Sequence, residues 1–404
     1  MSFHVVVIGG GAAGFFSALS CKFHHPEYRV TLLEKSDKLL AKVALSGGGR
    51  CNVTHACFDN KTFSQFYPRG ERQLKKLFFR FNAQDTMAWF EKRGVPLKTE
   101  SDNRIFPLSD NAQTIIDCLI SEANKLNVVI QKQVAISEIN QNKNGFILTS
   151  NRADIFADKI IVASGGGSKI SDFHWLQKLG YTIIPPVPSL FTFNMPNEPI
   201  KKLMGVSVSR CLLKIKGLKM QSVAPLLITH WGMSGPAVLK LSSWCARELN
   251  ASGYTFEVVV NWLDENEQHI KDILNTAWEK LGKRHVGNIN PFQLPGRLWL
   301  FLLEKNEIDF QTPWNEFSKK NQNKLLNTLV NDIYKVEGKT TFKEEFVTCG
   351  GVSLDEISFE TMESKIAPGI YFAGEVLDID GVTGGFNFQA AWTTGFIAGL
   401  LGTK

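Results

Sequence analysis

The sequence lacks paired cysteines and metal-ligand patterns. Its seven cysteines are an odd number and include no Cys-x-x-Cys pair. This excludes the usual patterns of a zinc ribbon, a secreted disulfide framework and a dithiol oxidoreductase. The eight histidines show no ligand spacing with cysteines or carboxylates, so we expect no metal site. Reduced thiols are typical of the cytoplasm, which is the location that we expect.

An excess of charge of one sign is also absent. The chain has 45 basic and 39 acidic residues, a net charge of +6, which we interpret as dispersed. The basic stretch over residues 69–80 alternates charged with apolar residues at helical spacing. Such a pattern is more typical of a solvated helix face than of an RNA-binding surface. We therefore expect no nucleic-acid partner.

Convincing membrane segments are missing as well. The uncharged residues 5–21 contain four glycines and are preceded by no Lys or Arg, unlike an export signal. The uncharged residues 381–403 contain Gly384, Gly385, Asn387 and Gln389, which are unfavourable in a membrane-spanning helix. We predict a nucleotide-binding loop in the first stretch, a buried helix in the second, and no membrane contact.

What the sequence does contain is an alternation of strand-like and helix-like segments over its first 185 residues. This alternation is typical of a parallel sheet with crossover helices. We expect strands at residues 4–8, 29–33, 128–130 and 159–163, and helices at 12–22, 71–81 and 112–126. The prolines of Ile184–Pro188 predict a domain boundary. We therefore divide the chain into four parts. Residues 1–185 and 339–404 are predicted to form one nucleotide domain, 186–262 an inserted β-rich unit, and 263–338 an inserted helical unit.

The most informative local motif is the run from His4 to Gly14. A five-residue apolar strand leads into Gly9, Gly11 and Gly14 and then into a helix, which is the context that a dinucleotide-binding fingerprint requires. Gly9 allows the tight turn, Gly11 the approach of a pyrophosphate, and Gly14 close packing of helix and strand. The second strand ends in Glu34 at the distance expected for a ribose contact. NAD and FAD fit this carboxylate, whereas NADP is disfavoured.

Further glycine-rich segments favour FAD over NAD. Loops at 46–52, 164–168 and 383–387 suit a cofactor that extends across several strand ends. Near the C-terminus, Gly369–Glu375 is a strand that ends in Ala-Gly-acid. This resembles the second signature of flavoproteins with two FAD motifs, in which the acid binds the ribityl chain. We therefore predict an α/β fold: a Rossmann-like, two-dinucleotide-binding-type FAD domain with an inserted β-rich and helical domain.

Longer blocks resemble the YhiN/BaiN-like flavoproteins, a bacterial family of FAD-dependent oxidoreductases. The resemblance spans nearly the whole chain and is carried by residues 8–14, 45–54, 229–237, 348–352 and 371–387. After Ser168 the chain departs from the family, which usually continues with a loop that contains Tyr-Pro and Thr-Gly. This departure leaves the contacts of that loop open.

The resemblance and the motifs together give a set of expected cofactor contacts. Val134 is expected from the resemblance alone, through backbone contacts to adenine. The expected FAD-binding residues are Gly9, Gly11, Ala12, Ala13, Gly14, Glu34, Lys35, Lys42, Arg50, Cys51, Asn52, Val134, Gly165, Gly374, Glu375, Asp380, Thr383, Gly384, Gly385, Phe386 and Asn387.

No catalytic residue stands out. Cys51 could be redox-active, but we favour a packing role; His230 could protonate a substrate, but a structural role is favoured. For Asp378 and Asp380 we prefer hydrogen bonds to the ribityl chain and backbone. The leading hypothesis is an FAD-dependent oxidoreductase that transfers hydride to or from a small organic substrate, with NAD(P)H as a possible transient donor. The alternatives are a flavin-binding sensor or assembly protein without turnover, and, less favoured, an RNA-modifying flavoprotein.

Overall fold

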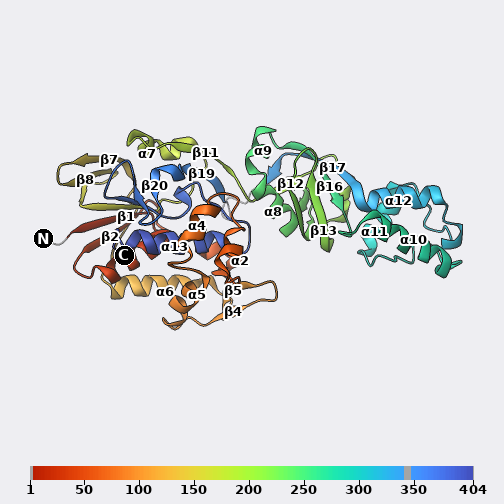
Figure 1. Ribbon diagram of the computed structural model, residues 1–404, viewed down its shortest axis with the longest axis horizontal. Coiled ribbons are helices and arrows are strands. Elements are labelled where there is room, and N and C mark those ends of the chain that lie inside the picture. The colour runs from red at the N-terminus through yellow and green to blue at the C-terminus, as the bar shows by residue number, and fades with distance from the viewer. Residues whose placement is uncertain (1–2, 341–346, 404) are drawn as a thin grey trace. The chain divides into compact units, whose positions relative to one another are not determined.

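The computed structural model describes residues 3–340 and 347–403. The chain divides into two compact units (Figure 1). One comprises residues 1–189 and 342–404, and we call it the nucleotide unit; the other comprises residues 190–341, and we call it the inserted unit. The nucleotide unit is thus built from two distant parts of the chain.

A mostly parallel sheet forms the centre of the nucleotide unit. Among the described residues its strand order is β20-β21-β22-β10-β1-β2-β6. The five strands β22 (Ile370–Phe372), β10 (Lys159–Val162), β1 (His4–Ile8), β2 (Arg29–Glu34) and β6 (Val129–Lys132) run parallel. After their first residues, His4 and Lys159, strands β1 and β10 are apolar and buried, and β22 is buried throughout, as expected for strands covered on both faces. The carboxyl ends of these strands consequently lie at one edge.

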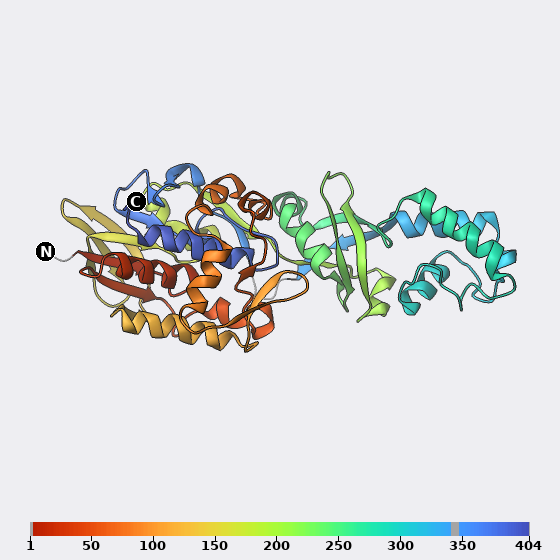
Figure 2. The ribbon, with the colours of Figure 1, turned by 60° about the horizontal axis from the view of Figure 1, so that its bottom comes forward.

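Two helices from opposite ends of the chain pack against each other over this sheet. These are α1 (Ala12–His24) and α13 (Phe386–Gly399), and Figure 2 shows them side by side. A Cβ at Gly395 would lie 2.7 Å from the Ala13 carbonyl oxygen, and one at Gly399 2.5 Å from that of Ser17. Glycine therefore permits the close approach. The expectation of a buried C-terminal helix is confirmed, and no helix among the described residues is long and apolar enough to span a membrane.

Smaller elements surround the central sheet. Two three-stranded sheets are recorded in the described part of the unit, β3-β5-β4 and β7-β8-β9. The helices are α2 (Ala41–Gly49), α3 (Asn60–Ser64), α4 (Glu71–Leu77), α5 (Ala83–Glu91), α6 (Ala112–Lys125) and α7 (His174–Lys178). The strands are β3 (Thr54–His55), β4 (Leu97–Thr99), β5 (Arg104–Pro107), β7 (Ile136–Asn142), β8 (Gly145–Ser150), β9 (Ile155–Ala157), β11 (Ile183–Pro188), β19 (Thr348–Val352), β20 (Ile357–Ser358) and β21 (Glu363–Ser364).

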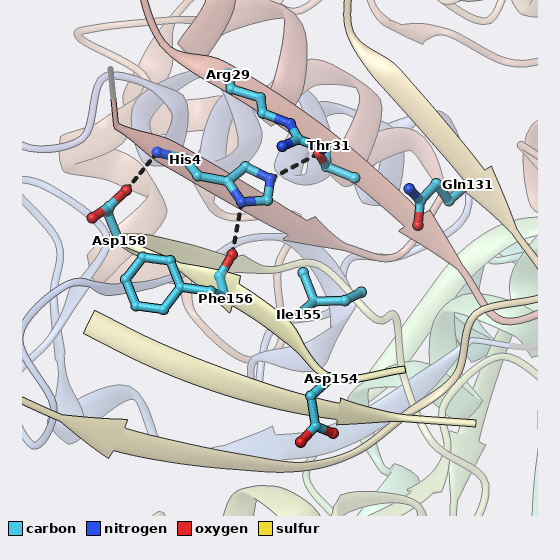
Figure 3. Close-up of a pocket in the computed structure, with 8 residues that line it drawn as sticks. All are labelled: His4, Arg29, Thr31, Gln131, Asp154, Ile155, Phe156 and Asp158. Atoms are coloured by element: carbon cyan, nitrogen blue, oxygen red, sulfur yellow. Dashed lines mark hydrogen bonds between the residues drawn. The ribbon is translucent and has the colours of Figure 1, made fainter. Parts of the chain in front are cut away.

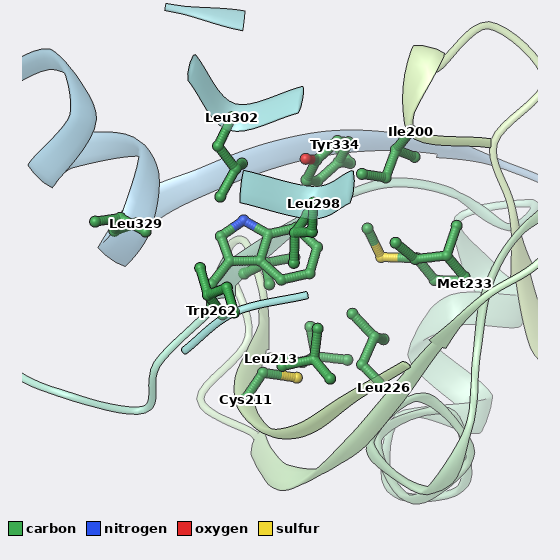
Figure 4. Packing of buried hydrophobic residues seen from close by; sticks show 14 of the residues in the cluster. Ile200, Cys211, Leu213, Leu226, Met233, Trp262, Leu298, Leu302, Leu329 and Tyr334 are labelled. Carbon is green, nitrogen blue, oxygen red and sulfur yellow. The ribbon is translucent and has the colours of Figure 1, made fainter. Parts of the chain in front are cut away.

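The inserted unit has its own sheet and core. Its strands are β12 (Thr192–Asn194), β13 (Ser207–Ile215), β14 (Gln221–Ile228), β15 (Gly232–Ser234), β16 (Thr255–Asn261), β17 (Asp332–Glu337) and β18 (Lys339–Thr340). Its helices are α8 (Pro236–Trp244), α9 (Ala246–Ala251), α10 (Glu267–Leu281), α11 (Gly296–Lys305) and α12 (Lys319–Asn331). Figure 4 shows residues from both the strands and the helices in one apolar cluster, among them Leu213, Trp262 and Leu298.

The proline-rich segment has a structural role of its own. Ile183–Pro188 forms strand β11, which pairs antiparallel with β19 inside the nucleotide unit, and the chain passes into the inserted unit after Ser189. Proline is tolerated there because the pairing is interrupted between Ile184 and Val187. The predicted helix at 71–81 is also shorter and ends at Leu77. The separation of a β-rich from a helical inserted domain stays a prediction.

Candidate functional site

The loops that follow β1, β2, β10 and β22 lie together at the carboxyl edge of the parallel sheet. At the first of them Gly9 has a φ of +115°, and a Cβ there would lie 2.2 Å from the Ala163 carbonyl oxygen. A Cβ at Gly14 would lie 1.8 Å from the Gly9 oxygen, whereas nothing lies within 4 Å of a Cβ at Gly11. The open space at Gly11, directly before Ala12 begins α1, suits an approaching phosphate group.

Glu34 organises the second loop of this edge. Its carboxylate accepts hydrogen bonds from the backbone N–H groups of Gly10 and Ser36, both at 2.8 Å. The Glu34 carbonyl oxygen in turn accepts from the Val134 N–H at 2.9 Å. The structure therefore brings Val134 beside Glu34, where the adenosine end of a dinucleotide is expected. Lys35 is exposed.

The two glycine signatures meet directly. A Cβ at Gly374 would lie 2.7 Å from the Ala13 Cβ, and the Gly374 N–H donates to Thr394 Oγ1 at 2.9 Å. The adjacent Glu375 accepts from Lys42 Nζ at 2.5 Å and from the Thr348 N–H at 3.0 Å. Sequence reasoning expected Lys42 and Glu375 at one cofactor, and the structure brings them into contact.

Thr348 and Gly166 lie in segments that the sequence singled out, but neither residue was named among the expected cofactor contacts. The Thr348 side chain is buried, and its Oγ1 has no hydrogen-bond partner in the described structure. A Cβ at Gly166 would lie 2.3 Å from that Oγ1 and 3.0 Å from Glu375 Cδ. The glycine of the third loop therefore leaves room beside a buried hydroxyl and a carboxylate. Gly165, its neighbour, has a φ of +77° and open space around a Cβ.

The segment before α13 forms another wall of the site. Gly384 and Gly385 have φ values of +129° and +91°, and a Cβ at Gly385 would lie 2.6 Å from the Thr54 carbonyl oxygen. In its hydrogen-bonded orientation the Asn52 amide accepts from the Gly385 N–H at 2.9 Å. The Asn387 side chain bonds both the N–H and the carbonyl of Gly381. Asn52 and Asn387 thus hold the segment in shape, and Thr383 lies within it.

Residues 66–69 contact the same segment and hold it in place; we call them the brace. The Val382 N–H donates to the Phe66 carbonyl at 2.9 Å, and Tyr67 Oη donates to that of Phe386 at 2.6 Å. The Phe66 ring stacks on buried Phe386, with ring centroids 4.4 Å apart. His55, which sequence reasoning also missed, contacts the Gly384 carbonyl through Nδ1 at 3.1 Å.

Asp380 is buried in this brace and is bound by Arg69. Arg69 donates from Nε at 2.5 Å and from Nη2, and the Ser189 hydroxyl donates as well. Burial raises the pKa of Asp380 to about 6, although the Arg69 charge and the hydrogen bonds from Arg69 and Ser189 act in the opposite direction. Asp378 accepts from the Gly350 N–H at 2.8 Å. The backbone role expected for Asp378 is therefore seen, while a cofactor contact of Asp380 stays a prediction.

Arg50 and Cys51 are engaged in other contacts. Arg50 pairs with Glu100 at 2.6 Å and lies over the Phe106 ring, 4.0 Å from its centroid. Cys51 has a φ of +62° and is fully buried, and burial raises the pKa of its thiol to about 12. A thiol that stays protonated is a poor nucleophile. The packing role favoured for Cys51 agrees with this geometry.

One pocket of the nucleotide unit lies away from this edge. It has a volume of about 560 Å³ and is lined by His4, Arg29, Thr31, Gln131, Asp154, Ile155, Phe156 and Asp158 (Figure 3). Its histidine is already held by the Phe156 carbonyl and by Thr31 Oγ1. Burial lowers the pKa of His4. These contacts account for the His4 side chain as a structural group. In the part of the chain that is described, no cluster of residues could hold a metal ion.

His230 belongs to the inserted unit and is exposed. It follows β14 in the turn that the Thr229 and Gly232 backbones close, and its ring packs edge-on against Trp231, with centroids 4.1 Å apart. This local packing explains the His-Trp pair without a catalytic role. The geometry assigns no acid or base from this turn.

Comparison with known proteins identifies a family and two relatives that match nearly the whole chain. Residues 3–401 match the family model described as the HI0933-like protein Rossmann domain. A ribosomal RNA dihydrouridine synthase of Escherichia coli strain K12 is 30% identical over 403 residues, covering 97% of this chain and 96% of that protein. A 3-dehydro-bile acid delta(4,6)-reductase of Clostridium scindens is 28% identical over 402 residues, covering 97% of each protein.

A solved structure confirms the fold class. The 3-ketosteroid-delta4-(5alpha)-dehydrogenase of Rhodococcus jostii RHA1 superimposes with a TM-score of 0.52 at 14% identity, covering 98% of this chain and 97% of that one. At this identity the match concerns the fold alone. The expected Rossmann-like architecture and the resemblance given for the sequence are both confirmed.

Proposed function

The chain belongs to the HI0933-like Rossmann-domain family, and we propose that it is an FAD-dependent oxidoreductase that reduces a carbon–carbon double bond conjugated to a carbonyl group. The observation that carries the proposal is the junction of the two signatures, with Gly374 against Ala13 and Glu375 against Lys42. A single nucleotide-binding loop would explain the first signature but not this convergence.

The buried groups at the carboxyl edge suit FAD. Gly11 leaves space for the pyrophosphate, and Glu34 lies at the strand end where a ribose is bound. The Thr348 hydroxyl, buried without a partner, and the Glu375 carboxylate offer polar contacts to a ribityl chain. Gly384 and Gly385 precede the N-terminus of α13, whose dipole favours negative charge. Of these features, the open space at Gly11 and the Thr348 hydroxyl without a partner are the two that the fold alone leaves unexplained.

FAD would supply the redox chemistry when bound, and the chain would orient it and exclude water. The positive end of α13 would stabilise negative charge close to Gly384 and Gly385. The brace formed by Phe66, Tyr67 and Arg69 keeps that helix end in place. We assign no residue as proton donor.

The reaction class is supported by the names of two relatives. A delta(4,6)-reductase and a dihydrouridine synthase are both named for adding hydrogen to unsaturated carbon atoms. A 3-dehydro (3-keto) compound with a double bond at position 4 is a conjugated enone, and the double bond of a uracil base is likewise conjugated to a ring carbonyl group. We propose the same bond type here, with a small organic substrate and NAD(P)H as a transient electron donor. A flavin-binding role without turnover is the alternative.

A uracil base within RNA is the second candidate substrate. The relative with 30% identity is named for ribosomal RNA, and the inserted unit of this chain carries most of its net positive charge. A base in RNA would bring phosphates to the protein, for which positive charge is favourable. The expected absence of a nucleic-acid partner therefore becomes a matter for experiment.

The first test is the visible spectrum of the purified protein before and after anaerobic addition of NADH or NADPH. A flavin spectrum that bleaches, and recovers when a steroid enone is added, supports the proposal. A flavin that is not reduced by NADH or NADPH, or that is reduced but not reoxidised by the enone, favours the flavin-binding role without turnover. Protein that stays colourless after reconstitution with FAD contradicts the cofactor assignment.

The cytoplasmic location is part of the proposal. Cys21, Cys51, Cys57, Cys118 and Cys211 are free thiols, and unpaired cysteines of this number are typical of a reducing compartment. Alkylation in freshly lysed cells, followed by mass spectrometry, tests whether these thiols are reduced in vivo.

A further inference from the structure

The positive charge of the chain is concentrated in one unit. The inserted unit contains 19 Lys and Arg residues against 14 Asp and Glu, whereas the nucleotide unit contains 26 against 25. The inserted unit therefore carries +5 of the net +6, contrary to the interpretation above that the charge is dispersed. Such an asymmetry between domains is a physical argument for an anionic partner.

Within the inserted unit the asymmetry is local. Residues 199–247 include eight basic residues and no acidic one. This stretch contains β13, β14 and the turn between them, which form an antiparallel hairpin. Basic and aliphatic side chains share its solvent side, which we call the hairpin face: Arg210, Lys214, Lys216, Lys219, Val223 and Leu227. Val223 and Leu227 are 37% and 38% exposed.

Neighbouring carboxylates neutralise only part of this charge. Arg210 pairs with Asp264 at 2.7 Å, and Lys216 pairs with Glu257 at 2.6 Å. No ion pair is recorded for Lys214 or Lys219 within the described residues, and both are exposed. The register places Lys214 opposite Gln221, and Leu212 opposite Val223. Two free ammonium groups thus lie next to an exposed aliphatic strand.

We propose that the hairpin face binds the sugar–phosphate backbone of RNA, with Lys214 and Lys219 contacting phosphates and Val223 and Leu227 packing on sugars or bases. Phosphate contacts give affinity without sequence specificity, so this surface would hold an RNA near the protein while another part selects the base. The inference deepens the second candidate substrate above and does not depend on a small-molecule activity.

The test is fluorescence anisotropy with a labelled, uridine-containing RNA hairpin, titrated at several salt concentrations. The full-length protein is compared with Lys214→Gln/Lys219→Gln and with the control Lys271→Gln/Lys320→Gln. The control removes two exposed lysines from α10 and α12 of the same unit. Loss of two phosphate contacts should make the fall in affinity between about 50 and about 200 mM salt smaller by roughly sevenfold for contacts to a single-stranded loop and roughly twelvefold for contacts to a duplex stem.

The result expected is a weaker, less salt-sensitive complex for the hairpin variant and an unchanged complex for the control. An equal loss in both variants would overturn the proposal, because net charge alone would then explain binding. Absence of RNA binding, or hairpin-dependent binding of phosphatidylserine vesicles instead, would overturn it too. Flavin bleaching and enone reduction by the hairpin variant should match the wild type, so failure here is separable from failure of the proposed oxidoreductase activity.

Discussion

Arg69 and Asp380 form a buried ion pair that joins segments 311 residues apart in the chain. The Arg69 side chain is 11% exposed and that of Asp380 is fully buried. The Ser189 hydroxyl bonds the same carboxylate, at the last residue of the nucleotide unit before the inserted unit begins. The Arg69 guanidinium therefore connects residues 66–69, the segment before α13 and Ser189, where the chain leaves the nucleotide unit.

Removing one partner of this pair should be costly. Arg69→Met leaves a buried carboxylate without its cation and should lower the free energy of unfolding by about 3–5 kcal/mol. The double variant Arg69→Met/Asp380→Leu should lose less than the sum of its two single variants, because no uncompensated charge remains. Urea unfolding measures each value. The control is Arg104→Met, whose exposed ion pair with Asp102 should contribute no more than about 1 kcal/mol.

Asp380 should also make stability depend on pH. Its pKa is raised to about 6, mainly by burial, so the folded state binds this proton more tightly than the unfolded chain does. The group's contribution is therefore most favourable below the unfolded pKa and is lost as pH rises through about 6, by about 3 kcal/mol in total. Urea unfolding of wild type and Asp380→Asn at pH values on both sides of this window tests the sign. The free-energy difference between them should be larger at the acidic end; a constant difference would contradict the assignment.

Gly11 and Gly14 should respond differently to the same substitution. Gly11→Ala adds a methyl group to open space and to backbone that any residue adopts, so the fold should persist. The methyl group would occupy the position of the pyrophosphate, so FAD affinity should fall at least about tenfold. Gly14→Ala would place its Cβ 1.8 Å from the Gly9 oxygen and should prevent stable folding. Gly296→Ala, in open space on the inserted unit, is the control. Quenching of flavin fluorescence measures affinity, and circular dichroism measures folding.

The thiols of Cys51 and Cys57 test how deeply the glycine-rich loop at residues 46–52 is buried. Burial raises the pKa of Cys51 to about 12, and Cys57 is only partly buried. Iodoacetamide at neutral pH should therefore modify Cys57 first and Cys51 only after unfolding. Cys57→Ser should abolish the fast phase seen by mass spectrometry. Fast labelling of Cys51 in folded protein would contradict its assignment as a packing residue.

Local patterns were sufficient to predict the strand, the glycine turn and the helix start at the N-terminus. The run from His4 to Gly14 combines a buried strand, three glycines with separate steric roles and a helix start, all within eleven residues. Strand β1 and the start of α1 accordingly lie where the sequence predicted them. Lys42 and Glu375 were also expected at one site, Glu375 as the end of the second glycine signature and Lys42 from the family resemblance.

The brace and its ion pair could not be predicted in this way. Arg69 lies in a basic stretch whose helical spacing indicates a solvated surface, yet its partner is distant in sequence. Thr348 belongs to a block that carries the family resemblance, but its significance for the site comes from burial beside Gly166 and Glu375. Contacts of this kind depend on tertiary packing, for which local periodicity carries no information.

Thr348 offers the sharpest test of the cofactor site, because its hydroxyl is buried without a partner in the described structure. A buried hydroxyl without a hydrogen bond costs stability, so Thr348→Val should leave the FAD-free protein equally stable or more stable. If the hydroxyl instead serves FAD, the same variant should bind FAD more weakly, by about fivefold to twentyfold for one hydrogen bond. The matched control is Thr86→Val, whose hydroxyl bonds the Asn82 carbonyl and Gln389 Oε1 and whose loss should lower stability. Thermal unfolding with and without FAD separates the two effects. Equal FAD affinity in Thr348→Val and wild type would remove this hydroxyl from the cofactor site.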